Sequence, residues 1–389
     1  MTAVKDCILT INGGSSSIKF SLYEVQGPLK NVLIGEIERI GIEGTKLTWN
    51  KEESIEVEAS DHAAAAMFLI EWLEKQPGFA VVKAIGHRIV YGMRHTGPQK
   101  ITPALMKELK GSIALDPEHM PGEIKLIEVF TAHNPDLPQI ACFDTSFHAD
   151  MPRMAKLLPL PRRFDVAGIQ RYGFHGLSYA YLLEELGKDA GARTILAHLG
   201  NGASLAAIKE GKSMDTSMGF TPTSGLPMST RTGDLDPGVA WYLMQSEKLS
   251  PEQFNHLVNH ESGLLGISGI SPDMRELMKQ EKDNPHAAEA VEFFCYQTRK
   301  WIGSFAAVLG GLDTLVFAGG IGENVPEVRE RICTSLGFLG ITLDKEKNHR
   351  NEHIISSDNS KVSVYVIPTN EELMIAKIIC EVLNFSIET

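Results

Sequence analysis

The sequence predicts a mixed α/β protein built from two related halves. Strand-like and helix-like segments alternate along its 389 residues, as they do in mixed α/β folds. The apolar run at 7–11, the turn NGGSSS and the alternating Ile18, Phe20 and Leu22 predict a β-hairpin with a Gly/Ser-rich tip. A strand, a glycine-rich turn and a second strand recur at 194–208. Two hairpins are a weak repeat by themselves, but their place at the start of each half suggests a duplicated fold with a cleft between the copies.

The composition is that of a globular protein with two or three domains. The residues are 43% hydrophobic and 22% charged, and at about 100–200 residues per domain the length suggests two or three. The formal net charge of -12 repels nucleic acid and anionic membranes. We therefore expect neither as a partner, although local basic sites for small anions remain possible.

Cysteine usage and hydropathy indicate a cytoplasmic protein. The 5 cysteines are scattered and include no C-x-x-C pair, so neither a disulfide framework nor a zinc site is expected. No apolar stretch approaches the roughly 18 residues of a membrane span, and the N-terminal apolar run is too short for a secretory signal. We expect no membrane segment.

Four helices are signalled by caps and periodicity. Asp61 precedes an alanine-rich amphipathic run that extends to about Gln76. The stretch SPEQ at 250–253 combines an N-cap serine, a proline at the first helical position and a capping-box glutamine. The segment 286–309 is long and apolar on one face, and TNEE at 369–372 opens a final helix with isoleucines at helical spacing.

Three loops of small residues each follow a predicted strand. They are NGGSSS from Asn12, GNGAS from Gly200 and GGIGEN from Gly319. None completes a Walker A loop or a G-x-G-x-x-G motif. Backbone N–H groups in such turns can converge on phosphate oxygens. Each loop taken alone is more often only a tight turn, but the three together favour a phosphate site.

Charged residues lie close to these loops in the predicted topology. Arg88 follows the predicted strand at 81–85, Asp144 comes directly after another strand, and His175 and Arg231 lie in loops that precede helices. Each has an ordinary explanation, as a solvated arginine, a paired histidine or a capping aspartate. Together a carboxylate, two arginines and a histidine match the needs of phosphoryl transfer, which requires positive groups around the moving phosphoryl and carboxylates for Mg²⁺.

Ten motifs, which run in order from residue 12 to residue 376, resemble those of the acetate kinase family, which includes acetate and propionate kinases. They are NGGSSSIKF, GHRIVYG, FDTSFH, YGFHG, HLGNGAS, DTSMGFTP, TRTGDLDPG, SGLLGISG, GGIGENVPEVR and PTNEELMIA. The resemblance implies reversible phosphoryl transfer from ATP to acetate, giving acetyl phosphate and ADP, and it implies a homodimer. It also implies two duplicated domains of the actin-like and sugar-kinase-like type, with ribonuclease H-like topology, around an ATP cleft.

The expected domain boundary is the proline-rich stretch at 150–161. We expect an N-terminal domain at 1–150, joined by the C-terminal helix 373–389, and a C-terminal nucleotide-binding domain at 151–372.

The resemblance also implies roles for individual residues. The catalytic positions are Asp144, His175 and Arg231. The positions that bind the carboxylate substrate are Arg88, Val90, Phe174 and Pro222. The metal positions, for Mg²⁺ or Mn²⁺, are Asn12 and Glu371. The positions that bind ATP or ADP are Lys19, His198, Leu199, Gly200, Asn201, Gly202, Asp273, Met274, Arg275, Gly320, Ile321, Gly322, Glu323 and Asn324.

The sequence departs from the family pattern at three places, one of which is the loop at 221–229, which is more polar and proline-rich than the usual form. The loop P-L-H-N-P of the family reads PEHMP here, so that Glu118 replaces a leucine of the acetate pocket, and H-G-T-S-H reads HGLSY, which ends at Tyr179. The substrate could therefore be propionate or another short carboxylate. A different class of function, an actin-like ATPase without carboxylate kinase activity, is disfavoured because such a protein would not need a carboxylate-binding arginine at position 88.

Overall fold

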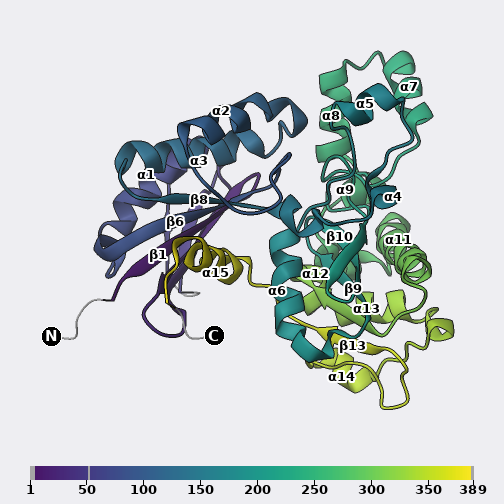
Figure 1. The fold of residues 1–389 in the computed structure, drawn as a ribbon. Helices are drawn as coiled ribbons and strands as arrows, with labels where there is room; N and C mark the ends of the chain where they lie inside the picture. The colour runs from purple at the N-terminus through teal and green to yellow at the C-terminus, as the bar shows by residue number, and fades with distance from the viewer. Residues whose placement is uncertain (1–4, 51–52, 387–389) are drawn as a thin grey trace. The chain divides into compact units, whose positions relative to one another are not determined.

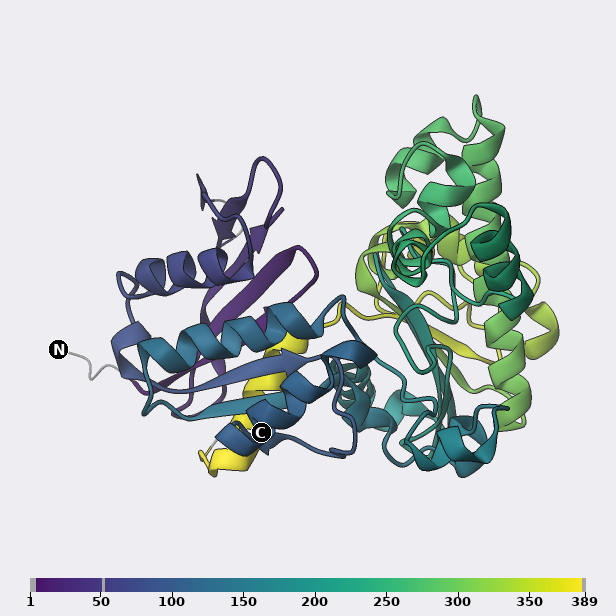
Figure 2. The ribbon, with the colours of Figure 1, turned by 90° about the horizontal axis from the view of Figure 1, so that it is seen from above.

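The computed structural model describes residues 5–50 and 53–386, and the chain divides into two compact units. The first comprises residues 1–147 and 370–389, and the second comprises residues 148–369. Each unit contains one β-sheet with helices packed against it (Figures 1 and 2). The predicted mixed α/β class is confirmed.

The first unit is built on an eight-stranded sheet in the order β5-β4-β3-β2-β1-β6-β8-β7. Its strands are β1 (Cys7–Gly13), β2 (Ser17–Glu24), β3 (Lys30–Glu38), β4 (Lys46–Trp49), β5 (Glu53–Glu56), β6 (Val82–Ile89), β7 (Gln99–Lys100) and β8 (Gln139–Phe143). Its helices are α1 (His62–Leu73), α2 (Pro103–Gly111), α3 (Met120–His133) and α15 (Glu371–Leu383), with 3₁₀ turns at Phe79–Val81, Ile113–Leu115 and Asp144–His148. Helices α1 and α3 pack together on one face of the sheet, and α15 lies on the other face (Figure 1).

The second unit is built on a five-stranded sheet in the order β11-β10-β9-β12-β13. Its strands are β9 (Arg193–Leu199), β10 (Ala203–Lys209), β11 (Lys212–Thr216), β12 (Thr314–Ala318) and β13 (Ser363–Val366). Its helices are α4 (Arg153–Lys156), α5 (Arg162–Val166), α6 (Gly176–Leu186), α7 (Pro237–Ser246), α8 (Pro251–His260), α9 (Gly263–Ser268), α10 (Met274–Gln280), α11 (Pro285–Leu309), α12 (Gly319–Asn324), α13 (Pro326–Cys333) and α14 (Lys345–His349), with 3₁₀ turns at Gly187–Ala190 and Gly337–Leu339. The long helix α11 packs against β9, β10 and β11.

The two sheets share the same strand order at their centres. In the first unit β3, β2 and β1 are antiparallel neighbours, and β6 and β8 continue the sheet parallel to β1. In the second unit β11, β10 and β9 are antiparallel neighbours, and β12 and β13 continue the sheet parallel to β9. This repeated order is the duplication that the two hairpins suggest.

Both predicted hairpins are present. In the first, Asn12 of β1 pairs with Lys19 of β2. In the second, Leu199 of β9 pairs with Ala203 of β10. Because turn residues and alternating apolar residues are local signals, a single sequence was enough to locate both hairpins.

Strand β6 is longer than the sequence predicts. The expected strand ends at Ile85, which would leave Gly86, His87 and Arg88 beyond it, but β6 continues to Ile89 and contains all three. The reason is that β6 lies between β1 and β8, and parallel pairing with β8 holds its backbone as far as Ile89. The buried His87 ring is accommodated there because it makes a 2.7 Å hydrogen bond to the Gln139 side chain.

The predicted helix starts agree with the structure. Asp61 caps α1 by accepting the N–H of Ala64, and α8 begins with the predicted capping box. Helix α1 ends at Leu73, three residues before the expected end at Gln76. Among residues 5–50 and 53–386, no helix combines the length and the apolar character needed to cross a membrane.

The glycine-rich segment GGIGEN is a helix and not the expected loop. It forms α12, which begins at Gly319 with φ 76°. The left-handed backbone and the absence of a side chain are both required there, because a Cβ atom would lie 2.8 Å from the carbonyl oxygen of Leu199. The Glu323 side chain accepts the N–H of Gly319 at 2.8 Å, which stabilises the first turn.

Helix α15 packs very closely on the first sheet at Gly86. A Cβ atom at this position would lie 2.5 Å from Ile375 and 2.6 Å from Ile379, both buried residues of α15. Glycine in the middle of a strand is costly by itself, so its presence reflects this close approach.

We therefore expect Gly86→Ala to lower the free energy of unfolding by ~1–3 kcal/mol, because the added methyl overfills the contact with α15. The measurement is chemical denaturation. Gly303→Ala in α11 is the matched control, since no heavy atom lies within 4 Å of its added methyl and alanine favours the helix. Equal stability of the two variants would contradict the packing argument.

Candidate functional site

The first hairpin brings Asn12 and Lys19 to one end of the first sheet. The two residues are paired across β1 and β2. Burial opposes the charge of Lys19, but the carboxylates of Glu36, Glu372 and Glu371 outweigh it and raise the pKa of the ammonium group. Lys19 therefore carries a firmly positive charge beside an acidic cluster.

Arg88 and Asp144 form a buried ion pair at the same end of the sheet. Nε and Nη2 of Arg88 donate to Oδ2 of Asp144 at 2.9 and 2.7 Å, and the Asp144 side chain is fully buried. Nη1 of Arg88 lies 3.4 Å from both Oδ1 of Asn12 and the carbonyl oxygen of Gly13. Burial disfavours the Arg88 charge, but the carboxylate of Asp144 outweighs it and raises the pKa of the guanidinium.

The first turn of α15 adds two carboxylates. Nδ2 of Asn12 donates to Oε2 of Glu371 at 2.8 Å and to Oε1 of Glu372 at 3.1 Å. Burial, followed by the charge of Glu371, raises the pKa of Glu372. The structure therefore brings together, within the first unit, both residues that the sequence assigns to a metal.

These oxygen donors suit Mg²⁺ as one part of its ligand set, and they do not form a closed cage around it. Mg²⁺ is held by oxygen ligands, usually one or two carboxylates together with water and substrate phosphates. Two adjacent carboxylates, one of them with a raised pKa, carry negative charge that a divalent cation would compensate. Over the part of the chain that the structure describes, no group of three or more His, Cys, Asp and Glu side chains could hold a metal ion.

In the second unit, two predicted nucleotide loops lie side by side. Strands β9 and β12 are parallel, and Ala318 pairs with His198. The turn at 200–202 follows β9, and α12 follows β12. A Cβ atom on Gly200 would lie 3.8 Å from the backbone nitrogen of Gly320, so the two segments approach one another at backbone distance.

The buried side chain of Arg329 holds helix α12 in place. The guanidinium of Arg329 is fully buried and donates to the carbonyl oxygens of Gly322 and Glu323 at 2.8 and 3.0 Å. It also donates to Asn348 and to Oδ1 of Asn351. Burial lowers the pKa of Arg329 to about 10. The carbonyl end of α12 is thus held by a cation whose partners are all neutral oxygens.

His175 and Arg231 converge on the turn after β9. A Cβ atom on Gly202 would lie 3.2 Å from Nε2 of His175 and 3.9 Å from Nη1 of Arg231. Nη1 of Arg231 also donates to the carbonyl oxygen of Pro222 at 3.2 Å. The backbone of Ser229 donates to the carbonyl oxygen of Asn201 at 3.2 Å, which ties the arginine loop to the glycine turn. Two cationic or N–H donor groups therefore face one exposed backbone turn, as a phosphoryl site requires.

The remaining predicted residues of the second unit are more scattered. Phe174, which precedes His175, and Pro222, which accepts from Arg231, are both buried. Asp273 caps α10, and Arg275 on the same turn donates to it at 2.6 Å. The hydrogen bond from Arg275 lowers the pKa of Asp273. The structure thus assembles one group of predicted residues within each unit and leaves the Asp273–Arg275 turn on its own helix.

A sequence model of the acetokinase family matches residues 7–377. The chain belongs to the acetokinase family. It is 43% identical over 390 residues to an acetate kinase of Rhodopseudomonas palustris, which covers 96% of this chain and 98% of that relative. It is also 43% identical over 385 residues to a propionate kinase of Citrobacter rodentium, with 95% of each chain covered.

A solved member of the family has the same fold. The crystal structure of Porphyromonas gingivalis acetate kinase superposes with a TM-score of 0.86 at 37% identity, covering 97% of this chain and 100% of the other. The two-domain, two-sheet architecture of this acetokinase family member is therefore shared along its whole length.

Glu123, which was not predicted from the sequence, is a buried carboxylate beside the predicted substrate residues Arg88 and Val90. It lies in the first turn of α3, and both of its carboxylate oxygens are 3.1 Å from the backbone nitrogen of Val90. Burial raises the pKa of Glu123 to about 8, against the opposing effect of Arg88. The signal in the sequence is a carboxylate on the apolar face of α3, at helical spacing from Leu126 and Ile127.

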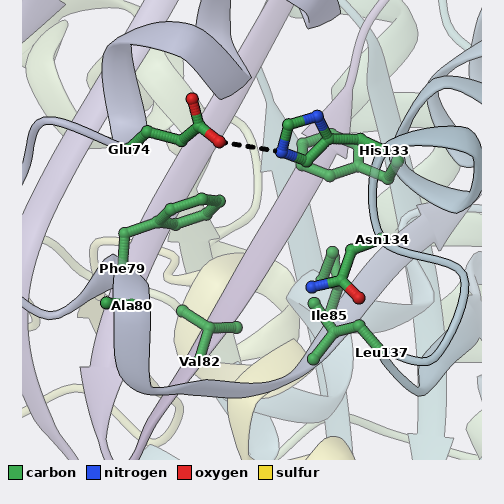
Figure 3. A pocket seen from close by; sticks show the side chains of 9 residues that line it. Glu74, Phe79, Ala80, Val82, Ile85, His133, Asn134 and Leu137 are labelled. Atoms are coloured by element: carbon green, nitrogen blue, oxygen red, sulfur yellow. Dashed lines mark hydrogen bonds and ion pairs between the residues drawn. The ribbon is translucent and has the colours of Figure 1, made fainter.

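Figure 3 shows a separate hollow of about 340 Å³ at the amino ends of β6 and β8. Apolar side chains that include Phe79 and Leu137 line it, and Glu74 pairs with His133 at 3.1 Å. The predicted residues of the first unit lie at the opposite, carboxyl ends of these parallel strands. The hollow is therefore distinct from the candidate site.

Glu123→Gln should change how stability depends on pH. An unfolded Glu titrates near pH 4.3, roughly, whereas Glu123 in the folded protein titrates near pH 8, so the folded state binds the extra proton between these values. The stability of the wild type relative to the variant is then greatest below pH 4.3, roughly, and falls as the pH rises through 8. We expect a fall of about 4 kcal/mol between pH 5 and pH 9 in denaturant titrations, because roughly 1.4 kcal/mol is lost per pH unit until Glu123 ionises near pH 8.

Glu128→Gln is the control for this experiment. Glu128 lies on the same helix but is half-exposed and pairs with Lys110 at 2.6 Å. Its stability difference from the wild type should stay nearly constant between pH 5 and pH 9. If the Glu123→Gln difference were equally flat, the buried carboxylate would not hold a proton at neutral pH.

Proposed function

We propose that this protein transfers the γ-phosphoryl group of ATP reversibly to acetate, giving acetyl phosphate and ADP. The observation that carries the proposal is the convergence of His175 and Arg231 on Gly202. Relatives at 43% identity over almost the whole chain are named acetate kinases and propionate kinases, which supports a short carboxylate as the acceptor.

In this reaction an oxygen of the acetate carboxylate attacks the γ-phosphorus of ATP. A new O–P bond forms, and the bond to the β,γ-bridging oxygen breaks, so that ADP leaves with the electron pair. Acetate titrates near the range of Asp and Glu and is already ionised at neutral pH, so the attack requires no base. Charge on the transferring phosphoryl is the main demand, and Nε2 of His175 and the Arg231 guanidinium would meet it.

Arg88 would hold the acetate carboxylate, and Val90, Phe174 and Pro222 are the other positions that the resemblance assigns to the substrate. Arginine suits this role because its planar fork matches a carboxylate. Asp144 accepts two hydrogen bonds from Arg88 through a single oxygen, so it is better placed to orient the arginine than to remove a proton. Arg88 carries one positive charge and Asp144 one negative charge, so the ion pair is neutral before the substrate binds.

The nucleotide would occupy the second unit. Its phosphates would lie along the turn from His198 to Gly202, and its adenosine along Gly320–Asn324 and Asp273–Arg275. Backbone N–H groups of such turns suit phosphate oxygens. The resemblance also assigns Lys19 to the nucleotide. Asn12 and Glu371 would hold Mg²⁺ or Mn²⁺. Such an ion, when bound, neutralises and orients the β- and γ-phosphates.

We further propose that two copies associate through the surface of α7, and that the protein works in the cytoplasm. No residue of α7 is buried, and its Trp241 and Tyr242 are 68% and 66% exposed. Aromatic side chains are enriched at protein interfaces, and large exposed apolar patches mark them. The 5 scattered cysteines fit a reducing compartment.

The decisive experiment is an acetate-dependent hydroxamate assay with ATP and Mg²⁺, run beside an ATPase assay without acetate. Formation of acetyl hydroxamate, with little phosphate release in the absence of acetate, supports the proposal. Phosphate release that is equal with and without acetate, and no hydroxamate, would favour an ATPase instead.

Asp144→Asn and Arg231→Ala should each lower kcat roughly a hundredfold or more while the protein stays folded, because Asp144 orients the arginine proposed to hold the acetate and Arg231 is proposed to contact the transferring phosphoryl. Asp136→Asn and Arg162→Ala, at exposed positions, are the matched controls. Circular dichroism checks the fold of all four variants. Near-wild-type turnover of either site variant would contradict the assignment.

Glu118 tests the identity of the acid. It is half-buried in the turn that precedes α3. We expect Glu118→Leu to change kcat/KM for acetate by less than about tenfold, because a glutamate that faced the methyl pocket would be costly to desolvate. The assay is a panel of acids from formate to butyrate. A much larger gain for acetate would show that Glu118 acts against it, and would point to a different physiological acid.

A further inference from the structure

We propose that Tyr179 is a positioning residue of this enzyme, which fixes the orientation and the tautomer of His175 through the hydroxyl of Ser204. The inference rests on the proposed function, in which His175 contacts the transferring phosphoryl. Tyr179 ends one of the three stretches where the sequence departs from the family pattern, and the resemblance gives the tyrosine there no role.

The three side chains form a continuous buried chain of hydrogen bonds. The Tyr179 hydroxyl bonds to Oγ of Ser204, and Oγ of Ser204 lies 2.8 Å from Nδ1 of His175. Tyr179 and Ser204 are both 0% exposed, so water cannot replace either partner. Tyr179 lies in the first turns of α6, Ser204 lies on β10, and His175 precedes α6, so the chain spans two elements of the second unit.

The chemistry of the hydroxyls sets the direction of this chain. A phenol is a stronger donor and a weaker acceptor than an alcohol, so the Tyr179 hydroxyl donates to Ser204. The Ser204 hydroxyl then has its own hydrogen available for Nδ1 of the neutral His175 imidazole. An imidazole that accepts at Nδ1 carries its hydrogen at Nε2. Nε2 is the atom nearest to Gly202, so this tautomer presents an N–H to the phosphoryl oxygens.

The rest of the surroundings fix the plane of the His175 ring. The ring of His198 stacks on it with centroids 4.3 Å apart and an angle of 23°. Nδ1 of His198 is in turn bonded to Oγ of Ser178 at 2.8 Å. The backbone of His175 is left-handed, with φ 59°, which restricts the direction of its side chain. Stacking and backbone determine where the ring lies, and the Tyr179–Ser204 chain determines which nitrogen carries the hydrogen.

Without the phenol, the Ser204 hydroxyl would be free to rotate, and His175 would populate both tautomers. The tautomer with hydrogen on Nδ1 presents a lone pair to the phosphoryl oxygens in place of a donor. Binding of acetate and ATP should be little affected, because neither Tyr179 nor Ser204 is among the groups proposed to contact them. The loss should therefore fall on kcat.

The kinetic test compares Tyr179→Phe, Tyr179→His, Ser204→Ala and the double variant Tyr179→Phe/Ser204→Ala. We expect Tyr179→Phe to lower kcat about tenfold with KM values within twofold, as for loss of a transition-state contact. Tyr179→His should recover most of this loss, because an imidazole N–H can also donate to Ser204. The double variant should be no slower than Ser204→Ala alone, since residues that act in one chain are not additive.

Tyr365→Phe is the matched control for loss of a phenol. Tyr365 is a buried tyrosine of β13 in the same unit, and the proposal gives it no role. It should leave kcat unchanged. If Tyr179→Phe does not fold, as judged by circular dichroism, Ser204→Ala alone takes its place with the same expected loss of kcat.

The second readout does not depend on activity. Long-range ¹H–¹⁵N spectra of ¹⁵N-histidine-labelled protein distinguish the two neutral tautomers, and His175→Gln identifies the signal. In the wild type we expect hydrogen on Nε2, and in Tyr179→Phe a mixture of tautomers.

An unchanged tautomer together with unchanged kcat in Tyr179→Phe, or additive losses in the double variant, would overturn the proposal and leave the kinase function intact. If the wild type formed no acetyl hydroxamate, the proposed function would fail. The spectra would then decide by themselves whether Tyr179 sets the tautomer of His175.

Discussion

The parallel pairing of strands next to each hairpin is the constraint on which both groups of site residues depend. Three parallel strands, β1, β6 and β8, end at one edge of the first sheet, and β9, β12 and β13 end at one edge of the second. The carboxyl ends of parallel strands lie at the same edge of a sheet, so residues far apart in sequence meet at that edge. Arg88 reaches Asp144 across 56 positions in this way. The site residues are distant in sequence, but they lie close to the paired strands whose backbone hydrogen bonds align them.

Local features were predictable from the sequence because their causes are local. The two hairpins, the cap at Asp61 and the capping box of α8 each depend on residues within a few positions of one another. The end of β6 was not predictable, because neighbouring strands and not its own composition decide where it stops. The resemblance named the residues of the candidate site, but their partners in space, such as Glu123 opposite Val90, come from long-range packing that a single sequence does not encode legibly.

The chain has a net charge of -12, and two of its buried arginines, Arg88 and Arg329, have partners of different kinds. Arg88 is balanced by a carboxylate, which leaves the pair neutral and fixed in direction. Arg329 donates its hydrogen bonds to neutral oxygens, two of which are carbonyl oxygens of α12. The first arrangement orients a side chain, and the second holds a backbone segment. Surface charge therefore says little about the potential within either unit.

The division of the chain has a consequence for its synthesis. The second unit is one continuous segment, 148–369, inserted into the first, whose α15 follows it in the sequence. The core of the first unit includes the contact of Gly86 with Ile375 and Ile379, so its sheet has one face uncovered until those residues leave the ribosome. The second unit has no such dependence. On a translating ribosome the domain that begins the chain is thus the last to be completed, and the nascent sheet is the form of this protein most in need of a chaperone.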